Sequence, residues 1–473
     1  FASFVAAAVA IAALATGSAN AAALPVDARV RRALRQQGTV NLIVTFKDSP
    51  ERVQRILSAS KESEFATRGQ QIASLVRSLE NHAQTSQQEV NLLLAREAGT
   101  ATPLFSDYQS FWVSNQVFIK DATFALVEKL VGLTSVAEIM EEEVLPLPTV
   151  TVVLAGNSSS EDIVAPSANE WGVAIVEADA VWDKGFTGQG VVVSSIDTGV
   201  HYTHEALSGN FRGVYGWYDP EKKLAMPYDV NGHGTHTMGT IAGAYGIGVA
   251  PGATWMACKG CRATGCHESD YLACFQFLAC PTKPDGMDRD CSKAPNVVNN
   301  SWGGGQGSTF YGTAINTLRA AGVIPIFSNG NSGPTCGTAN SPADLPTVIG
   351  VGATDINDAL ADFSSRGPAV NGLVKPDISA PGDVVRSAWN TSTTAYETLS
   401  GTSMAGPHVV GVVALLLSAQ PSLTYDQVKT ALTSNTDRKL KPSNSTCGGT
   451  SDAIFPNNQY GYGRVNALKT VGL

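Results

Sequence analysis

Short apolar strands alternate with helical stretches along the second half of the chain, and this alternation constrains the fold more than any other feature. Residues 191–196 (VVVSSI) carry no charge, which is typical of a strand that helices cover on both faces. The alternation predicts an α/β fold with a doubly wound, mostly parallel sheet, whose chemistry sits at the carboxyl ends of the strands. The expected buried strands lie at 191–196, 254–257, 296–300, 323–327 and 348–351, and the expected helices at 233–244, 269–279, 309–321 and 403–417.

The first part of the chain is richer in charged residues and helix formers. It predicts a small α+β domain over residues 22–145, followed by a linker over 146–169 that contains Pro146 and Pro148. Proteolysis usually concentrates in such linkers, and a second domain is expected over 170–473. Within the first domain we expect strands at 41–46, 110–119 and 136–145 and helices at 49–98 and 123–133.

Composition excludes several classes of protein. The 473 residues include 46 glycines and are 43% hydrophobic but only 15% charged, which indicates compact packing rather than disorder. The net charge of -9, with no Lys/Arg block, argues against a nucleic-acid partner. Residues 1–15 are apolar and an Ala19-x-Ala21 pattern follows, so we expect a signal peptide over 1–21 that lacks its beginning. A membrane anchor is the alternative, but it needs about 18 or more apolar residues.

All eight cysteines lie between residues 258 and 447. In a secreted, extracellular protein an even number of cysteines indicates disulfides, although the sequence does not distinguish among the possible pairings. The alternative is a zinc knuckle in the segment 258–267 (CKGCRATGCH), for which no second CxxC pair is present. Sequons for N-glycosylation on exposed loops begin at Asn157, Asn390 and Asn444.

Three segments place catalytic residue types at the end of a strand or the start of a helix. Asp197 ends the first buried strand, His233 lies in NGHGTH at a helix start, and Ser403 lies in GTSMAGPH before an apolar helix. A serine hydroxyl is a weak nucleophile until a base accepts its proton, and that base needs a carboxylate to fix its tautomer. A metal-binding pair is the alternative for His233 and His236, but such pairs on a helix are normally four residues apart rather than three.

The three motifs, in the order Asp, His, Ser, resemble those of the subtilisin-like serine proteases, the subtilases of the peptidase S8 family. The resemblance covers residues 170–470, includes VVNNSWGG at 297–304 and KPDISAPG at 375–382, and is greatest to bacillopeptidase F-like members. Residues 22–145 resemble the inhibitor I9-like propeptide of these proteases in their position and in the order of their elements. The resemblance implies a subtilisin-like sheet preceded by a ferredoxin-like propeptide domain.

The same resemblance implies a secreted serine endopeptidase that acts on protein substrates through an acyl-enzyme. Ser403 would be the nucleophile, His233 the general base and Asp197 the carboxylate that orients it, while the side chain of Asn331 would stabilise the oxyanion. The implied enzyme is a monomeric, self-processing zymogen without a cofactor or a membrane anchor, and its partners are protein or peptide substrates and its own propeptide. A backbone edge for substrate is implied at Ser301, Trp302 and Gly303.

One loop departs from the family pattern. Many subtilases insert a calcium-binding loop after the His motif, whereas here the segment 243–251 is short and Ala206 stands where those relatives have a ligand Asp. We therefore expect no metal there and expect disulfides to anchor the loops instead. Two other functions remain as alternatives: an inactive binding protein, which would have a broken triad, and an esterase, which would have a Gly-x-Ser-x-Gly motif.

Overall fold

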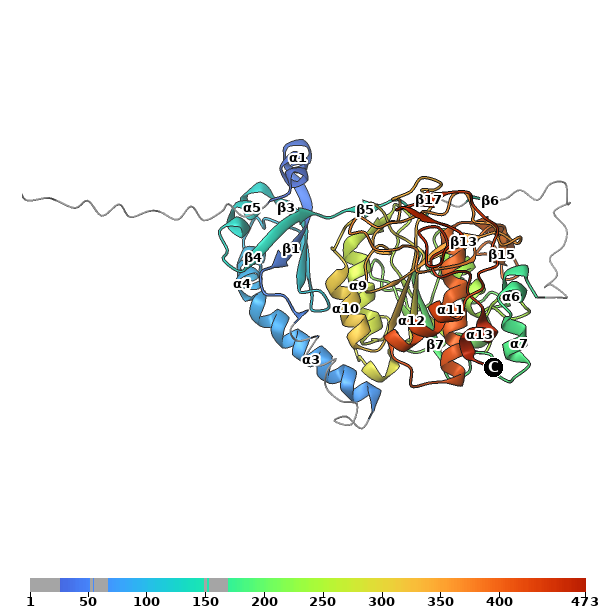
Figure 1. Cartoon of the computed structure of the whole chain (residues 1–473). Coiled ribbons are helices and arrows are strands. Elements are labelled where there is room, and N and C mark those ends of the chain that lie inside the picture. The colour runs from blue at the N-terminus through green and yellow to red at the C-terminus, as the bar shows by residue number, and fades with distance from the viewer. Residues whose placement is uncertain (1–25, 52–53, 55–66, 149–150, 153–168) are drawn as a thin grey trace, which may run out of the picture.

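The chain forms two units, and the computed structural model describes residues 26–51, 54, 67–148, 151–152 and 169–473 of them. Figure 1 shows the smaller N-terminal unit in blue and cyan beside the larger unit, which is coloured from green to red. The expected signal peptide, the sequon at Asn157 and most of the expected linker lie outside the described residues.

The larger unit is built on a seven-stranded sheet whose neighbouring strands run parallel, in the order β14-β13-β12-β11-β7-β9-β8. This confirms the predicted α/β fold with a doubly wound, mostly parallel sheet. The five predicted strands form its centre, and the two edge strands, β8 and β14, were not predicted. The strands are β7 (Val192–Asp197), β8 (Trp217–Tyr218), β9 (Thr254–Lys259), β11 (Val297–Asn300), β12 (Ile324–Ser328), β13 (Ile349–Thr354) and β14 (Ile378–Pro381).

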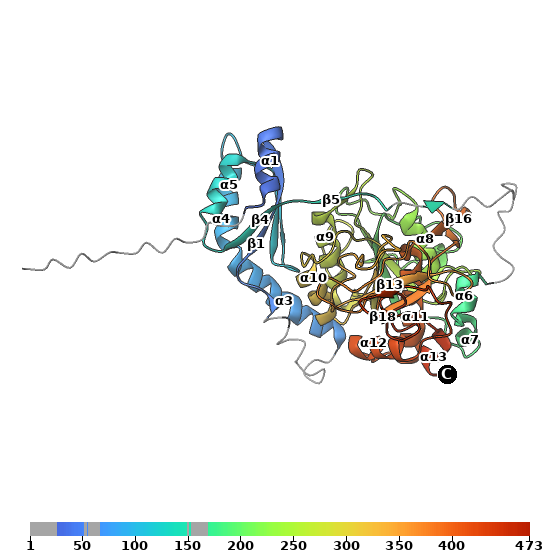
Figure 2. The same ribbon diagram turned by 45° about the horizontal axis from the view of Figure 1, so that its top comes forward.

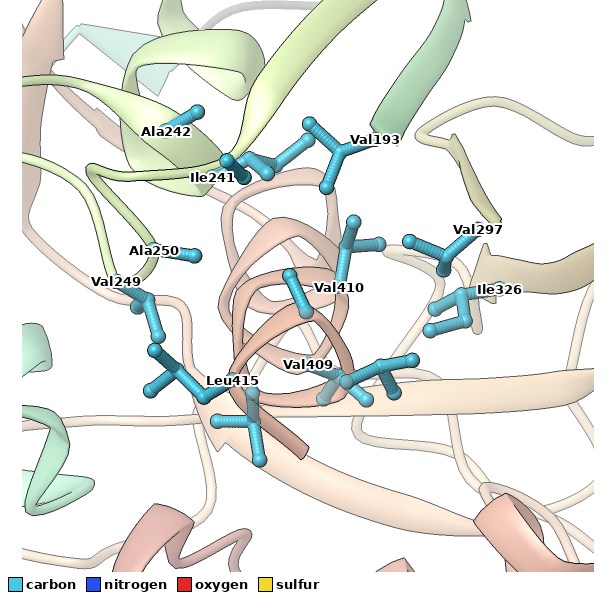
Figure 3. Packing of buried hydrophobic residues seen from close by; sticks show 14 of the residues in the cluster. Val193, Ile241, Ala242, Val249, Ala250, Val297, Ile326, Val409, Val410 and Leu415 are labelled. Atoms are coloured by element: carbon cyan, nitrogen blue, oxygen red, sulfur yellow. The ribbon is translucent and has the colours of Figure 1, made fainter. Parts of the chain in front are cut away.

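One face of this sheet is covered by α8 (His233–Ala242) and α11 (Thr402–Ala419). Val193 and Val297 of the sheet pack against Val410 of α11 in one continuous core, as Figure 3 shows. Among the described helices, α11 alone is long and apolar enough to cross a membrane, and its side chains are instead buried in this core. The uniformly apolar sequence of α11 therefore reflects a central helix that is surrounded by protein.

The opposite face is covered by α9 (Glu268–Ala279) and α10 (Gly312–Ala320). Ile196 and Val298 face this second core together with Leu278, because successive side chains of a strand point to opposite faces. The remaining elements of the larger unit are α6 (Trp171–Ile175), α7 (Ala178–Trp182), α12 (Tyr425–Ser434), α13 (Ala467–Val471), β10 (Cys266–His267), β15 (Val385–Ala388), β16 (Tyr396–Ser400), β17 (Thr446–Cys447) and β18 (Thr450–Ser451).

The N-terminal unit is a four-stranded antiparallel sheet in the order β2-β3-β1-β4, with helices between the strands. The chain order β1, helices, β2, β3, helix, β4 agrees with a ferredoxin-like α+β domain. The strands are β1 (Thr39–Phe46), β2 (Asp107–Phe111), β3 (Gln116–Thr123) and β4 (Val136–Glu141), and the helices are α1 (Ala28–Gln37), α3 (Arg68–Ser86), α4 (Gln88–Ala98) and α5 (Phe124–Val131).

Three predicted elements of this unit are wrong in detail. The single strand expected at 110–119 is a hairpin, because the chain turns between β2 and β3 at Asn115, which has a φ of 55°. The strand expected at 136–145 is two strands, since β4 stays in the small sheet while β5 (Val144–Leu145) pairs with β10 of the larger unit. The helix expected at 49–98 is interrupted at Gln87, and the helix α1 was not predicted.

The N-terminal unit rests on the helices α9 and α10 of the larger unit (Figure 2). The Trp112 amide donates to Oε1 of Gln276 at 3.1 Å, and the Arg68 guanidinium, at the start of α3, donates to the main-chain carbonyls of Ala294 and Pro295. The two units therefore share an interface formed with α9, α10 and the segment 294–295.

All eight cysteines form disulfides, as predicted. The zinc knuckle does not form, because Cys258 and Cys261 are each bonded to a different cysteine. The pairs are Cys258–Cys274, Cys261–Cys266, Cys280–Cys291 and Cys336–Cys447.

Candidate active site

Asp197 and His233 form a buried pair at the carboxyl end of β7. Asp197 is the last residue of this strand, and its Oδ1 lies 2.7 Å from Nδ1 of His233, the first residue of α8. The close approach requires a glycine at position 234, since a Cβ there would overlap the carbonyl oxygen of Gly199. Thr198 donates its main-chain N–H to the same Oδ1 at 2.7 Å. The carboxylate is therefore held in one orientation toward the imidazole.

The carboxylate of Asp197 raises the affinity of the imidazole for a proton. Burial of His233 lowers its pKa, but the ion pair and hydrogen bond with Asp197 outweigh burial and raise the pKa above its usual 6.5. Nε2 of His233 is buried and has no hydrogen-bond partner among the residues that the structure describes. The imidazole is thus oriented through Nδ1 and has Nε2 available to accept a proton.

Ser403 is brought to the same edge of the sheet by the first turn of α11. Its hydroxyl donates to the carbonyl of Ser301 at 3.2 Å, and the Ser301 hydroxyl donates to the carbonyl of Ser403 at 2.9 Å. Ser301 follows β11, the strand next to β7, so Ser403 stands beside the strand end that carries Asp197. In this structure the Ser403 hydroxyl donates its hydrogen bond to the Ser301 carbonyl rather than to the imidazole of His233.

Asn331 lies at the same edge, in the segment after β12. Its Oδ1 accepts hydrogen bonds from the main-chain N–H and the hydroxyl of Thr402, both at 2.8 Å. Because the oxygen is occupied, the exposed Nδ2 is left as a donor next to Ser403. Thr402 was not singled out from the sequence, although a hydroxyl residue directly before the serine of GTSMAGPH was a possible signal.

A second residue missed by sequence reasoning is Asp229. Its carboxylate accepts from the hydroxyl of Thr198 at 2.8 Å and from the main-chain N–H groups of Asn231 and Gly232, both at 2.9 Å. It therefore ties the turn before His233 to the turn after Asp197. The signal for it was an acidic residue four positions before the histidine of NGHGTH.

The predicted substrate edge, Ser301 to Gly303, lies along the end of β11. The ring of Trp302 stacks on Tyr271 with centroids 3.9 Å apart and is only 7% exposed, so it belongs to the core on the α9 side. A Cβ on Gly303 would lie 2.6 Å from the carbonyl oxygen of Ser341. The edge is therefore formed by main chain, with the tryptophan ring packed beneath it.

The chain is bound to the larger unit on both sides of residues 146–150. Before this segment β5 pairs antiparallel with β10, and after it β6 (Thr151–Val152) pairs antiparallel with β16, which ends at Ser400, three residues before Ser403. A Cβ on Gly265 would lie 2.7 Å from a side-chain methyl of Val144 and 2.9 Å from the carbonyl oxygen of Leu145, so glycine is needed where β5 packs. Residues 146–150 thus connect two strand pairs that are formed with the larger unit.

Other histidines near the site contact main-chain carbonyls. Nε2 of His236 lies 3.0 Å from the Val385 carbonyl, and burial lowers the pKa of His236 to about 3. Burial also lowers the pKa of His408, to about 4.

Across the described ranges no cluster of three or more His, Cys, Asp and Glu side chains is arranged to hold a metal ion. At the loop where relatives place a calcium ligand, the carbonyl of Ala206 accepts from the Ala244 amide at 2.8 Å.

Comparison with known proteins agrees with this geometry. The profile of the subtilase family matches residues 188–463. Bacillopeptidase F of Bacillus subtilis (strain 168) is 35% identical over 481 residues, a match that covers 94% of this chain and 32% of that protein. Subtilisin DY of Bacillus licheniformis is 35% identical over 56% of this chain and 90% of its own length, and Subtilisin Savinase of Lederbergia lenta is 35% identical over 63% and 96%. The chain thus spans about a third of Bacillopeptidase F and nearly all of both subtilisins.

Proposed function

The chain belongs to the subtilase family of serine endopeptidases, and we propose that it is a secreted protease made as a self-processing zymogen. The observation that carries the proposal is the buried pair in which Asp197 holds Nδ1 of His233 while Nε2 has no hydrogen-bond partner among the described residues. Its substrates would be proteins or peptides that pair with the main-chain edge at 301–303. We propose that it acts as a monomer.

The proposed reaction uses the side chains in a fixed order. Nε2 of His233 takes the proton of the Ser403 hydroxyl, whose oxygen attacks the carbonyl carbon of the peptide bond. The oxyanion that forms is stabilised by Nδ2 of Asn331, and His233 then gives its proton to the leaving amine. Water hydrolyses the resulting acyl-enzyme by the same steps. The pKa of His233, raised by Asp197, suits this role because the imidazolium is stabilised while the proton is held.

The proposed propeptide is the unit at 22–145, and the proposed catalytic domain covers 170–473. On one side of residues 146–150 β5 pairs with β10, and on the other side β6 pairs with β16, so the chain is bound to the larger unit both before and after this segment. We therefore place the self-processing bond within 146–150, a narrower range than the whole linker. Cleavage there would leave the N-terminal unit bound to α9 and α10 as an inhibitor until it dissociates.

Secretion is supported by two independent features. The apolar segment at 1–15 ends in a signal-peptidase pattern, and all eight cysteines are oxidised in the folded chain. Of the three sequons within the described residues, the one at Asn299 is buried in β11, and Nδ2 of Asn390 donates to the carbonyl of Asp229 at 3.2 Å, whereas Asn444 is exposed. Asn444 is thus the better proposed site for a glycan.

Labelling with a serine-directed fluorophosphonate tests the function directly. The expected result is stoichiometric labelling of Ser403 in the processed enzyme, and a new N-terminus within 147–151. Absence of labelling in a folded, processed preparation would contradict the proposed activity.

Replacement of Asn331 by alanine should reduce kcat for a peptide substrate about 10²–10³-fold, with a much smaller change in KM. That figure is borrowed from the corresponding donor of subtilisin. The side chain acts on the oxyanion, which exists only in the transition state, so the loss falls on kcat. Steady-state kinetics measure both constants, with Asn371→Ala, in an exposed loop, as the matched control. An equal rise in KM with unchanged kcat would assign Asn331 to ground-state binding instead.

The interface between propeptide and protease should weaken as the pH rises. Burial, and then the nearby carboxylates of Glu143 and Glu142, raise the pKa of Glu268 to about 8, although the Glu143 amide donates to it at 2.9 Å. The neighbouring Glu142 accepts from Ser269 and His267, and its pKa is lowered. A carboxyl group whose pKa is raised in the complex favours association at low pH, and this contribution is lost as the pH rises from about 4.5 to 8.

Processed propeptide should therefore dissociate at least about tenfold more readily at pH 8.5 than at pH 5.5, as measured by gel filtration of the processed enzyme. Glu268→Gln keeps the acceptor for the Glu143 amide and removes the charge. This variant should therefore retain the propeptide equally at pH 5.5 and pH 8.5. Glu128→Gln, on the exposed side of α5, is the matched control. Unchanged pH dependence in Glu268→Gln would show that another group controls release.

A further inference from the structure

One disulfide, Cys336–Cys447, differs from the other three in its exposure. Cys336 is exposed, in the segment between β12 and β13, while its partner Cys447 is fully buried on β17. The six cysteines of the other pairs are at most 9% exposed. A thiolate must approach a sulfur along the disulfide axis, so only the Cys336 end is open to attack from solvent.

This disulfide restrains the loop that carries the proposed oxyanion donor. Cys336 and Asn331 both lie in the segment between β12 and β13, and hydrogen bonds from the main-chain N–H groups of Ser332, Gly333, Gly337 and Thr338 join this loop to residues 363–367. The disulfide is the covalent link between this loop and the β17–β18 hairpin. It joins residues 111 positions apart, the largest separation among the four pairs, so opening it frees the longest stretch of chain.

The hairpin at the other end of the bond is well anchored. Nδ2 of Asn458 donates to the Cys447 carbonyl at 3.0 Å, and Nε2 of Gln459 donates to the Ser445 carbonyl at 2.8 Å. The guanidinium of Arg366 donates to the Ser445 hydroxyl at 3.1 Å. Opening the bond therefore removes a covalent restraint from the loop that carries Asn331, while the hairpin keeps its hydrogen bonds.

We propose that Cys336–Cys447 is a thiol-exchange site, at which a low-molecular-weight thiol such as glutathione reduces this bond first and thereby lowers turnover. A thiolate attacks Sγ of Cys336, forms a mixed disulfide with it and expels the thiolate of Cys447. A second thiolate then attacks the mixed disulfide, which leaves Cys336 reduced and the two small thiols joined. Two electrons pass to the protein pair, two small thiols are oxidised, and reoxidation reverses the change. The effect on turnover rests on the proposed protease function, whereas the order of reduction does not.

The order of reduction is tested on the full-length Ser403→Ala chain, which removes self-digestion. The protein is equilibrated with increasing glutathione, alkylated with iodoacetamide and mapped by mass spectrometry. The expected result is labelling of Cys336 and Cys447 at a thiol concentration about tenfold below that which opens any other pair. Labelling of Cys280 and Cys291, the next most exposed pair, at the same or a lower concentration would overturn the proposal.

The effect on turnover is tested on the active enzyme after the same mild reduction. We expect kcat to fall at least about fivefold while KM changes less than about twofold, with recovery on reoxidation, because the loop positions the Asn331 donor.

The double variant Cys336→Ser/Cys447→Ser should have the low kcat and no response to glutathione, and Cys280→Ser/Cys291→Ser should keep the response. Unchanged kcat after verified reduction would overturn the proposal. If the double variant does not fold, reduced wild-type enzyme decides the question alone. A chain with no protease activity but the expected labelling order would refute the proposed function and leave the exchange site standing.

Discussion

Replacement of Ser403 by alanine should leave the chain as an uncleaved precursor and reduce peptide hydrolysis by about 10⁶, the loss that removal of the nucleophile causes in subtilisin. Among the described residues the hydroxyl has one hydrogen bond, to the Ser301 carbonyl, so we expect its removal to leave the fold intact. The proposed self-processing bond lies within 146–150, between two strand pairs that bind the chain to the larger unit, and the same hydroxyl is expected to cut it. One substitution should therefore abolish both turnover and maturation.

The measurement is the size of the secreted chain after expression in a protease-free host, together with activity on a peptide substrate. Ser418→Ala is the matched control, because Ser418 is on the same helix α11 and its hydroxyl has no partner within the described parts of the chain. The control should mature normally. A Ser403→Ala precursor that is still cleaved within 146–150 would refute self-processing, and residual turnover near the wild-type value would refute the assigned nucleophile.

The centre of the sheet could be predicted because each of its strands is buried on both faces. The strands β7, β11 and β12 each place hydrophobic side chains against α11 on one face and against α9 and α10 on the other, so none of them alternates between apolar and charged residues. The edge strand β8 has two residues, too few for such a pattern. Burial on both faces, rather than strand propensity, was the predictive feature.

The N-terminal hairpin was missed for a different reason. The turn between β2 and β3 contains neither glycine nor proline, and the positive φ is taken by Asn115, whose Nδ2 donates to the carbonyl of Asp48 at 2.9 Å. The turn is therefore stabilised by Asp48, which is distant in the chain, and the local sequence around Asn115 does not predict this contact. The same holds for β5, which joins the larger unit only because β10 is adjacent in space.

The sequence predicted the reacting residues of the site, but not the residues that hold them in place by hydrogen bonds. Asp197, His233 and Ser403 each lie in a distinctive short motif, so their types and order were visible. Asp229 and Thr402 act through hydrogen bonds to Thr198 and Asn331, which depend on the placement of separate loops. The disulfide pairing was likewise set by proximity, and sequence spacing alone left it open.

Replacement of Asp197 by alanine should reduce kcat about 10⁴-fold, the order of loss known for the corresponding carboxylate of subtilisin. Asp197 has two separate effects on His233: it fixes Nδ1 by a hydrogen bond at 2.7 Å, and its charge raises the imidazole pKa. Alanine removes both effects and also leaves the Thr198 amide without its acceptor. The reaction then lacks both an oriented base and a stabilised imidazolium.

Asp197→Asn separates these two effects. Its Oδ1 can accept from Nδ1 of His233 and from the Thr198 amide, while its new NH₂ group faces the hydroxyl of Thr237, which lies 3.3 Å from Oδ2 in the present structure. Orientation is then kept and only the charge is lost. We expect a smaller fall in kcat than in the alanine variant, and an acid inflection of kcat/KM at lower pH, because burial continues to lower the pKa of His233 without the opposing carboxylate.

The pH profiles of kcat and kcat/KM are measured for the wild type, Asp197→Asn and Asp197→Ala. Asp426→Asn is the control for loss of one exposed carboxylate. If the asparagine and alanine variants lost the same activity, charge alone would account for the role of Asp197, and the hydrogen bond to Nδ1 would add nothing. If the inflection did not move in either variant, the group that titrates would not be His233. The expected order, wild type above asparagine above alanine, holds only if the carboxylate both orients the imidazole and stabilises its charge.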